Sequence, residues 1–222
     1  MKRLSIAIDG PAGAGKSSVA KVLAKKLGYL YIDTGAMYRA VTWAALEKQV
    51  NLEQDLQNFL KQLDLMMIPD GEGFKITVWN QDVTGLIRSP EVNNQVSKVA
   101  AIPAVREYLV ARQRLLANVG GVILDGRDIG SVVLPNADIK FYLTASVESR
   151  AKRRYLEIKD SQPEMTLELI QKNVAERDAM DMNRETSPLI EVEDAVHVDS
   201  TELTFDETVE KMQAIIEEHY DA

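Results

Sequence analysis

The fold of this 222-residue chain is decided by one stretch near its start, Gly10-Pro11-Ala12-Gly13-Ala14-Gly15-Lys16-Ser17-Ser18. Its first eight residues fit the pattern G-x-x-x-x-G-K-[ST]. An apolar segment that we predict to be a strand, 3–8, precedes it, and a segment with helical periodicity, 16–27, follows it. In that context the glycines let backbone amides and the start of the helix point into one concavity, a P-loop that holds phosphate. We therefore expect residues 10–18 to bind the phosphates of ATP.

Two side chains of this loop have separate expected roles. Lys16 places an ammonium group against the β- and γ-phosphates, and the Ser17 hydroxyl suits Mg²⁺, a cation that prefers oxygen ligands. P-loops serve ATPases, GTPases and kinases, so the loop alone does not identify the reaction. The chain lacks the Asn-Lys-x-Asp motif that reads guanine, which argues against a GTPase.

The rest of the chain alternates between predicted strands and helices. Gly28 stands where a helix C-terminal cap belongs. Such alternation indicates an α/β fold of three layers, with a central parallel sheet of about five strands and helical crossovers. The predicted strands are 29–32, 122–124, 139–143 and 195–198, and the predicted helices are 36–47, 147–158, 165–181 and 205–219.

The middle of the chain interrupts this pattern. Three short predicted strands, 63–68, 74–79 and 81–83, are separated by turn residues and form a small antiparallel insertion over about 63–89. Two helices follow, at 91–101 and 103–118. Trp79 is either a packing residue of this insertion or an exposed anchor for a partner, and packing is the commoner role of an aromatic residue on an amphipathic strand.

Composition excludes several classes of protein. There is no cysteine, so disulfides and thiolate metal sites are excluded, and the two histidines, His197 and His219, are too far apart to suggest a metal site. The formal net charge of -8 argues against nucleic-acid binding. We find no signal peptide and no apolar stretch long enough to span a membrane. We expect a cytoplasmic protein and, without a coiled-coil heptad or a long apolar stripe, a monomer.

Polar motifs at the ends of predicted strands supply candidate residues for a second phosphate. In Asp33-Thr34-Gly35-Ala36-Met37-Tyr38-Arg39, we expect Thr34 to cap the following helix and Arg39 to lie in its first turns. In Asp125-Gly126-Arg127-Asp128, Asp125 is placed to orient Mg²⁺-bound water. Arginine suits phosphate because its planar fork binds two oxygens, and phosphoryl transfer depends on positioning and electrostatic stabilisation. The candidate arginines are Arg39, Arg106, Arg127, Arg150, Arg153, Arg154, Arg177 and Arg184.

Two of the helices carry clusters at helical spacing. Arg150, Arg153 and Arg154 share one face, which indicates either an anion site or a solvated basic surface. Arg177, Asp181 and Arg184 share another face, where Asp181 would stay ionised between two arginines and accept a hydrogen bond from a ribose hydroxyl; a surface salt-bridge ladder is the alternative. The polar stretch 155–163 suits a mobile flap that excludes water.

Taken together, these motifs resemble the bacterial-type cytidylate kinases, which phosphorylate CMP and dCMP. The resemblance covers most of the chain, and its matching pieces are IDGPAGAGKSS, DTGAMYR, VAAIPAVRE, LDGRDIGSVV, SRAKRR and ERDAMDMNR. Thr34 departs mildly from the serine common in this family. Met180 and Met182 stand where some members carry arginines. The resemblance implies a single kinase domain over 1–222, an NMP-binding insertion over 63–105, and a helical lid with substrate-binding helices over 150–184.

The resemblance also implies a role for each candidate residue. Tyr38, Arg39 and Arg127 would hold the CMP phosphate, and Thr34 would also bind the substrate. Asp181 and Arg184 would bind ribose, with Arg177 nearby. Ser97, Arg106 and Asp128 would read cytosine, and Arg150 and Arg154 would close on ATP. The catalytic set would be Lys16, Arg127, Arg154 and Arg184, with Ser17 and, through water, Asp125 at Mg²⁺.

Three alternatives stay open. A small P-loop kinase acting on UMP, dTMP or a metabolite is the nearest one, although Asp128 and the insertion argue against it. A non-catalytic nucleotide-binding switch is the second, and the two basic clusters argue against it. An interaction protein that uses the antiparallel insertion as its binding face is the third.

Overall fold

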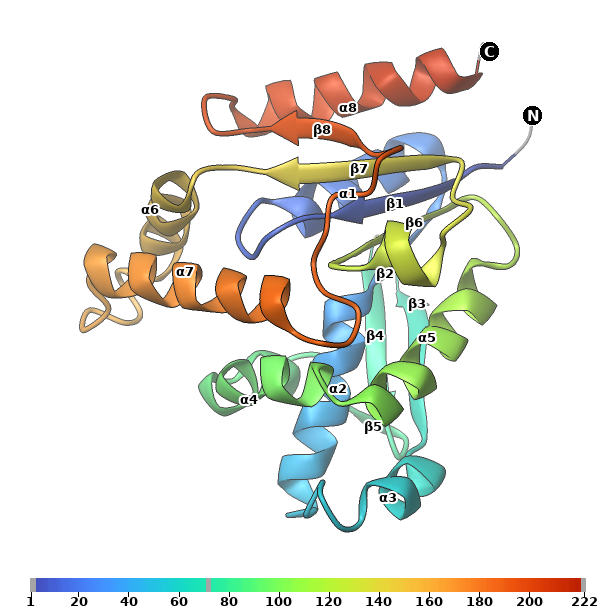
Figure 1. The fold of residues 1–222 in the computed structure, drawn as a ribbon, viewed down its shortest axis with the longest axis vertical. Helices are drawn as coiled ribbons and strands as arrows, with labels where there is room; N and C mark the ends of the chain where they lie inside the picture. The colour runs from blue at the N-terminus through green and yellow to red at the C-terminus, as the bar shows by residue number, and fades with distance from the viewer. Residues whose placement is uncertain (1–2, 71–72, 221–222) are drawn as a thin grey trace.

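The main sheet has five strands in the order β2-β6-β1-β7-β8, and every neighbouring pair is parallel. The computed structural model describes residues 3–70 and 73–220 (Figure 1). The strands are β1 (Ser5–Asp9), β2 (Leu30–Asp33), β6 (Val122–Gly126), β7 (Ile139–Thr144) and β8 (Val196–Asp199). The α/β fold class and the central sheet predicted from the sequence are confirmed.

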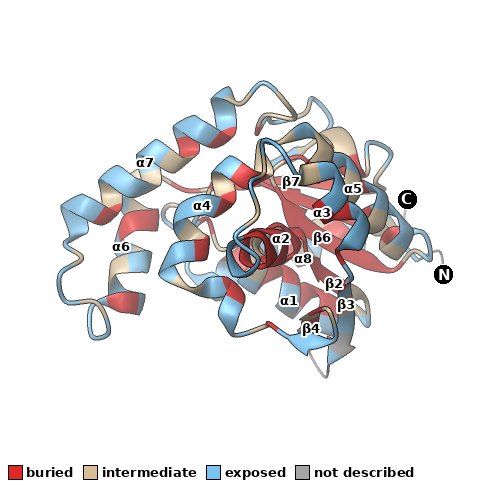
Figure 2. Ribbon diagram, turned by 90° about the horizontal axis from the view of Figure 1, so that it is seen from below, coloured by how far each residue is buried: buried red, intermediate tan, exposed pale blue. Residues whose placement is uncertain are grey.

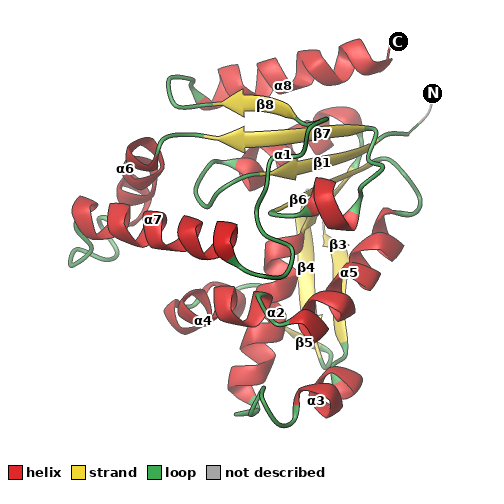
Figure 3. Cartoon of the chain, in the orientation of Figure 1, coloured by secondary structure: helices red, strands yellow, loops and turns green. Residues whose placement is uncertain are grey.

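Helices cover both faces of this sheet (Figure 3). On one face α1 (Lys16–Leu27) and α8 (Phe205–Tyr220) pack on Ile6 and Ile8 of β1. On the other face, α2 (Thr34–Glu47) and α5 (Pro103–Ala117) share a hydrophobic core with Ala7 of β1. Alternate residues of β1 therefore enter two separate cores, as in parallel sheets buried on both sides. Each fully buried isoleucine contributes about 1.5–3 kcal/mol relative to its exposed state.

Helix α1 begins and ends where the sequence predicted. Gly15 precedes it with φ 89°, and Gly28 ends it with φ 65°. The Gly28 amide approaches the carbonyl groups of the last turn, so this residue is the C-terminal cap that was expected. Helix α2 is buried along most of its length in the middle of the molecule (Figure 2).

The predicted antiparallel insertion is present as a three-stranded sheet in the order β3-β4-β5. Its strands are β3 (Leu65–Asp70), β4 (Gly73–Val78) and β5 (Gln81–Asp82). The predicted turn residues Gly71 and Glu72 lie outside the described residues. Helix α3 (Leu56–Gln62), which the sequence analysis did not predict, precedes the sheet, and η1 (Leu86–Arg88) and α4 (Pro90–Ala100) follow it. Tyr31 of β2 and Phe74 of β4 meet with ring centroids 5.9 Å apart.

Trp79 supports the packing interpretation of the insertion. Its indole Nε1 donates to the Gln62 carbonyl at 2.9 Å, and the Lys48 ammonium group lies 5.0 Å from its ring centroid. The side chain is half-buried and packs against the core beneath α2. A role in partner binding stays a prediction that nothing here supports.

A pair of helices projects from the carboxyl ends of the strands, α6 (Val147–Ile158) and α7 (Leu167–Asn183) (Figure 1). They pack on one another through a small core of Ala151, Ile158 and Ile170. Helix α6 has the bounds predicted from the sequence. A short π-helix, η2 (Ile129–Val133), follows β6 and was not predicted. In the described parts of the chain no helix combines the length and apolar character needed to cross a membrane.

Candidate functional site

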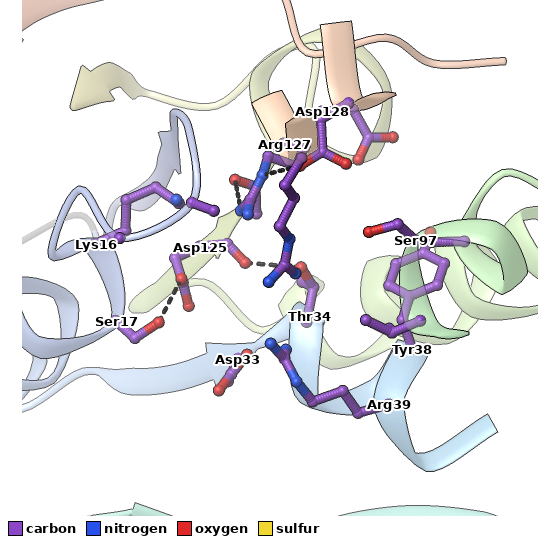
Figure 4. Close-up of a pocket in the computed structure, with 18 of the residues that line it drawn as sticks. Lys16, Ser17, Asp33, Thr34, Tyr38, Arg39, Ser97, Asp125, Arg127 and Asp128 are labelled. Atoms are coloured by element: carbon purple, nitrogen blue, oxygen red, sulfur yellow. Dashed lines mark hydrogen bonds and ion pairs between the residues drawn. The ribbon is translucent and has the colours of Figure 1, made fainter. Parts of the chain in front are cut away.

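A cavity of about 320 Å³ opens at the carboxyl ends of β1, β2 and β6 (Figure 4). Parallel sheets of this kind bind ligands at that edge. Of the predicted P-loop set, Ala12, Gly13, Gly15, Lys16, Ser17 and Ser18 line the cavity. All ten residues predicted to contact the acceptor also line it: Thr34, Tyr38, Arg39, Ser97, Arg106, Arg127, Asp128, Arg177, Asp181 and Arg184. Gly10, Pro11, Ala14, Arg150 and Arg154 are outside this lining.

The P-loop is held in shape by close backbone approach. Gly10 has φ 146°, and a Cβ there would lie 2.0 Å from the Leu143 carbonyl oxygen, so only glycine fits. Lys16 is buried, and its Nζ donates to the Pro11 carbonyl at 2.7 Å. Burial and the nearby Arg127 guanidinium lower the pKa of Lys16 well below its usual value. An anion beside Lys16 would oppose both effects, because it favours the charged ammonium.

Two oxygen-bearing side chains fit a Mg²⁺ site. Ser17 Oγ donates to Asp125 Oδ2 at 2.8 Å, and the Tyr31 hydroxyl donates to Asp125 Oδ1 at 2.8 Å. Burial and the neighbouring Asp33 carboxylate raise the pKa of Asp125 to about 6. A hydroxyl beside a carboxylate is a donor set that Mg²⁺ prefers, and a cation would offset the repulsion between Asp33 and Asp125.

The helix cap at Thr34 was predicted wrongly. Asp33 is the N-cap of α2, and its Oδ1 accepts from the Ala36 amide at 2.8 Å. A carboxylate stabilises a helix at this position more than a hydroxyl does, because its negative charge interacts favourably with the partial positive charge of the helix N-terminus. Thr34 instead belongs to the first turn, and its Oγ1 donates to the Asp125 carbonyl oxygen at 2.7 Å. Thr34 therefore ties α2 to the end of β6.

The loop after β6 carries the side chains of Arg127 and Asp128 into the lining of the cavity. Arg127 Nε lies 2.8 Å from Asp181 Oδ2. Asp128 accepts a short hydrogen bond from Arg106, and Arg184 Nη2 lies 3.8 Å from its other oxygen. The predicted neighbours of Asp181, Arg177 and Arg184, interact electrostatically with it, but its direct ion pair is with Arg127. Each carboxylate of this region pairs with an arginine from a different element.

Several polar atoms around the cavity make no hydrogen bond within 3–70 and 73–220. They are the Tyr38 hydroxyl, Arg106 Nε, Arg177 Nε and Arg184 Nη2. Buried polar atoms are almost always satisfied, so this group indicates a polar ligand. Burial and the nearby guanidinium groups of Arg127 and Arg39 lower the pKa of Arg177 to about 10. Crowded guanidinium groups of this kind are stabilised by an anion such as phosphate.

The three arginines of α6 do not form the expected common face. Arg150 is buried, and its guanidinium donates to Asp178 at 2.6 Å and to the carbonyl groups of Ala12 and Ala145. Arg153 donates to Ser200, at the end of β8. Arg154 is exposed and pairs with Glu157 at 3.0 Å. The three arginines thus have three different partners, and an anion site common to all three is not formed among the described residues; the expected contacts of Arg150 and Arg154 with ATP stay predictions.

Four further residues were missed by the sequence analysis. Asp33, Arg88 and Glu157 line the cavity, and Arg88 Nη2 lies 3.2 Å from Asp33 Oδ2. Asp9 lies just behind it and is buried. Asp33 and Asp9 both end strands, which is a signal that could have found them. Arg88 stands in no recognisable motif, and its place is set by the folding of the insertion.

Comparison with known proteins identifies the family. The sequence model of the cytidylate kinase family matches residues 6–218. The chain belongs to the cytidylate kinase family. It is similar to the cytidylate kinase of Ligilactobacillus salivarius (strain UCC118), with 52% identity over 98% of each chain. It is also similar to that of Bacillus subtilis (strain 168), with 50% identity over 98% of each chain.

Membership of the cytidylate kinase family confirms the resemblance drawn from the motifs, and with it the assignment to a kinase. Among solved structures, the chain is similar to an uncharacterized protein from Eubacterium ventriosum ATCC 27560, with a TM-score of 0.51 and 13% identity over 99% of each chain. At that identity the likeness concerns the fold alone.

Proposed function

We propose that this chain transfers the γ-phosphoryl group of ATP directly to the phosphate of CMP or dCMP. The main support for this proposal is the cluster of Arg106, Asp128 and Arg184, which lines the end of the cavity away from the P-loop. Cytosine presents an amino donor at N4 and acceptors at N3 and O2, so a carboxylate beside guanidinium donors complements it. Uracil presents an acceptor at position 4, which would oppose Asp128 and leave buried polar groups unpaired.

The arrangement of the side chains supports a two-sided reaction. In Figure 4, Lys16 and Ser17 lie on one side of the cavity and Tyr38 and Ser97 on the other, with Arg127 between them. In the proposed complex, residues 10–18 hold the ATP phosphates. Arg39, Arg127, Thr34 and Tyr38 surround the CMP phosphate. Asp181 accepts from a ribose hydroxyl, with Arg177 and Arg184 beside it, and Ser97 contacts the base.

The chemistry needs little from the protein beyond placement and charge. The acceptor phosphate is already an anion, so no protein base is required. Lys16 and Arg127 stabilise the negative charge on the transferring group, whereas Arg184, which the resemblance implied for the catalytic set, lies beside Asp128 on the base side. Mg²⁺ held by Ser17 and, through water, by Asp125 would neutralise charge on the ATP phosphates.

The lid of this proposal is the α6–α7 pair. Arg154 would reach ATP only after its ion pair with Glu157 breaks. Because that pair is exposed to solvent, breaking it costs little free energy. Arg150 would act from its present place, where it donates to the P-loop carbonyl of Ala12 at 2.9 Å. The NMP-binding insertion over 63–105 supplies Ser97 of α4 and borders Arg106 of α5.

A coupled ADP-release assay with a panel of nucleoside monophosphates tests the proposal. CMP and dCMP should give the highest kcat/KM, and UMP, dTMP, AMP and GMP should each be at least about tenfold lower. A higher kcat/KM for UMP or dTMP would favour the alternative pyrimidine kinase. Release of no ADP with any acceptor would favour the nucleotide-binding switch. The cytoplasmic location and monomeric state are further parts of the proposal, and sedimentation velocity tests the latter.

A further inference from the structure

Asp9 is a buried carboxylate that lies just behind the cavity without lining it. It is the last residue of β1 and directly precedes Gly10 of the P-loop. Its side chain contacts a distant part of the chain. Oδ1 accepts from the Ile129 amide at 2.8 Å, and Oδ2 accepts from the Gly130 amide at 2.7 Å. One carboxylate thus joins the strand that carries the donor loop to the segment after β6.

The two amides belong to the start of the π-helix η2. The first amides of any helix have no partner inside it, so they need an acceptor from elsewhere. Arg127 and Asp128 stand directly before η2, and Asp128 has φ −145° and ψ 28°, outside the helical region. The conformation that turns these two side chains into the cavity is therefore adjacent to the amides that Asp9 binds.

Space around this contact is limited. A Cβ at Gly130 would lie 3.1 Å from Lys140 Cδ and 3.4 Å from Asp9 Oδ2. A side chain at residue 130 would therefore press on Lys140 of β7 or on Asp9 of β1. The two hydrogen bonds to Asp9 and the close packing of Gly130 beside Lys140 together hold the start of η2 against β1 and β7. A π-helical turn is rare and frequently marks a functional site.

We infer that Asp9 is a positioning residue, which sets Arg127 and Asp128 relative to the P-loop and so aligns the acceptor with the ATP phosphates. This inference rests on the proposed function, in which Arg127 holds the acceptor phosphate and Asp128 reads the base. A carboxylate is required because it accepts two amides at once. Asparagine offers one acceptor, and its amino group would face the second backbone N–H.

The test compares Asp9→Asn with a matched control at the other end of β1. Asp138 Oδ2 accepts from the Ser5 amide at 2.8 Å and from the Ser5 hydroxyl at 3.0 Å, so Asp138→Asn weakens a carboxylate–amide contact at the start of β1. We expect Asp9→Asn to raise KM for CMP about tenfold and KM for ATP less than about threefold, because one charge-assisted hydrogen bond is lost on the acceptor side. Asp138→Asn should change neither KM by more than about twofold.

Two further variants keep the test decisive. If Asp9→Asn does not fold, Gly130→Ala places a Cβ against Lys140 Cδ and Asp9 Oδ2, disturbs the same contact, and should also raise KM for CMP. Equal CMP KM values in a folded Asp9→Asn or Gly130→Ala and in Asp138→Asn would overturn the inference. Asp128→Ala in the same assay separates the two proposals. If Asp128→Ala leaves KM for CMP unchanged, the proposed base-reading role is wrong; if only Asp9→Asn leaves it unchanged, the positioning role alone is wrong.

Discussion

Replacing Arg150 by alanine should destabilise the folded protein far more than the same change at Arg154, four residues further along α6. The Arg150 side chain is 4% exposed, and its partner Asp178, at 2.6 Å, is 11% exposed. The same guanidinium donates to the carbonyl groups of Ala145 at 2.8 Å and Ala12 at 2.9 Å. Among the residues that the structure describes, Arg154, at 50% exposure, pairs only with Glu157, at 63%. The two arginines thus share a helix and differ in burial.

The expected magnitudes follow from that difference. Removing one partner of a buried pair leaves the other charge uncompensated and costs about 3–5 kcal/mol, whereas an exposed pair contributes about 0–1 kcal/mol. In urea denaturation followed by circular dichroism, a slope of about 3 kcal/mol/M converts these to midpoint shifts. Arg150→Ala should lower the midpoint by roughly 1–2 M, and Arg154→Ala by less than about 0.3 M.

A double-mutant cycle with Asp178→Ala makes the reasoning refutable. Once Arg150 is absent, removing Asp178 eliminates a buried unpaired carboxylate, so the double variant should be more stable than the sum of the single losses predicts. We expect a coupling on the order of 1–3 kcal/mol. Strict additivity, or equal midpoints for Arg150→Ala and Arg154→Ala, would show that the buried bridge between α6, the P-loop and α7 does not carry this energy.

Four other changes test separate parts of the site. Lys16→Ala should slow ADP formation at least about a hundredfold with an unchanged far-UV spectrum, since one charge-stabilising donor is lost; activity within threefold of wild type would contradict this role. Asp128→Ala should lower the CMP/UMP ratio of kcat/KM about tenfold, and an unchanged ratio would remove this residue from base reading. Gly10→Ala should lower the thermal midpoint clearly, because its Cβ would meet the Leu143 carbonyl at 2.0 Å; an unaltered midpoint would disprove that close approach. Burial raises the pKa of Asp9 to about 6, so the folded protein binds a proton there more tightly than the unfolded chain. As pH rises from about 4 to 6, wild type should therefore lose stability relative to Asp9→Asn by on the order of 2–3 kcal/mol, measured by urea denaturation at each pH; a pH-independent difference would refute it.

Local signals in the sequence predicted the parts of the fold that depend on neighbours along the chain. Helix α1 was bounded correctly because the loop glycine before it and Gly28 after it have positive φ angles that favour glycine. Helix α6 was bounded correctly, and Ser146, whose Oγ accepts from the Ser149 amide, caps its start. Thr34, Arg127 and Asp128 could be predicted at the cavity because they follow strands that a parallel sheet brings to one edge, whereas Ser97 and Arg106 were named only through the resemblance.

Pairing between distant elements could not be predicted in this way. Helical spacing places Asp181 beside Arg177 and Arg184, but its partner in the fold is Arg127, 54 residues away. The spacing of Arg150 on α6 indicated either an anion site or a solvated surface, whereas in the fold the side chain is buried and donates to a carboxylate of α7. The π-helix η2 depends on Asp9, 120 residues before its first amide, and no local pattern indicates it.

The strand order of the main sheet affects how the protein can fold while it is being synthesised on the ribosome. Strand β1 lies between β6 and β7, and Ser5 pairs with Val122. At about 5–20 residues per second, β1 emerges roughly 6–23 s before its first partner is synthesised. During that interval Ile6 and Ile8, which are fully buried in the folded protein, have no neighbouring strand to pair with. The strand that leads into the P-loop is therefore the strand of the main sheet that waits longest for a partner during synthesis. We expect chaperones to bind the nascent chain while this apolar strand is exposed.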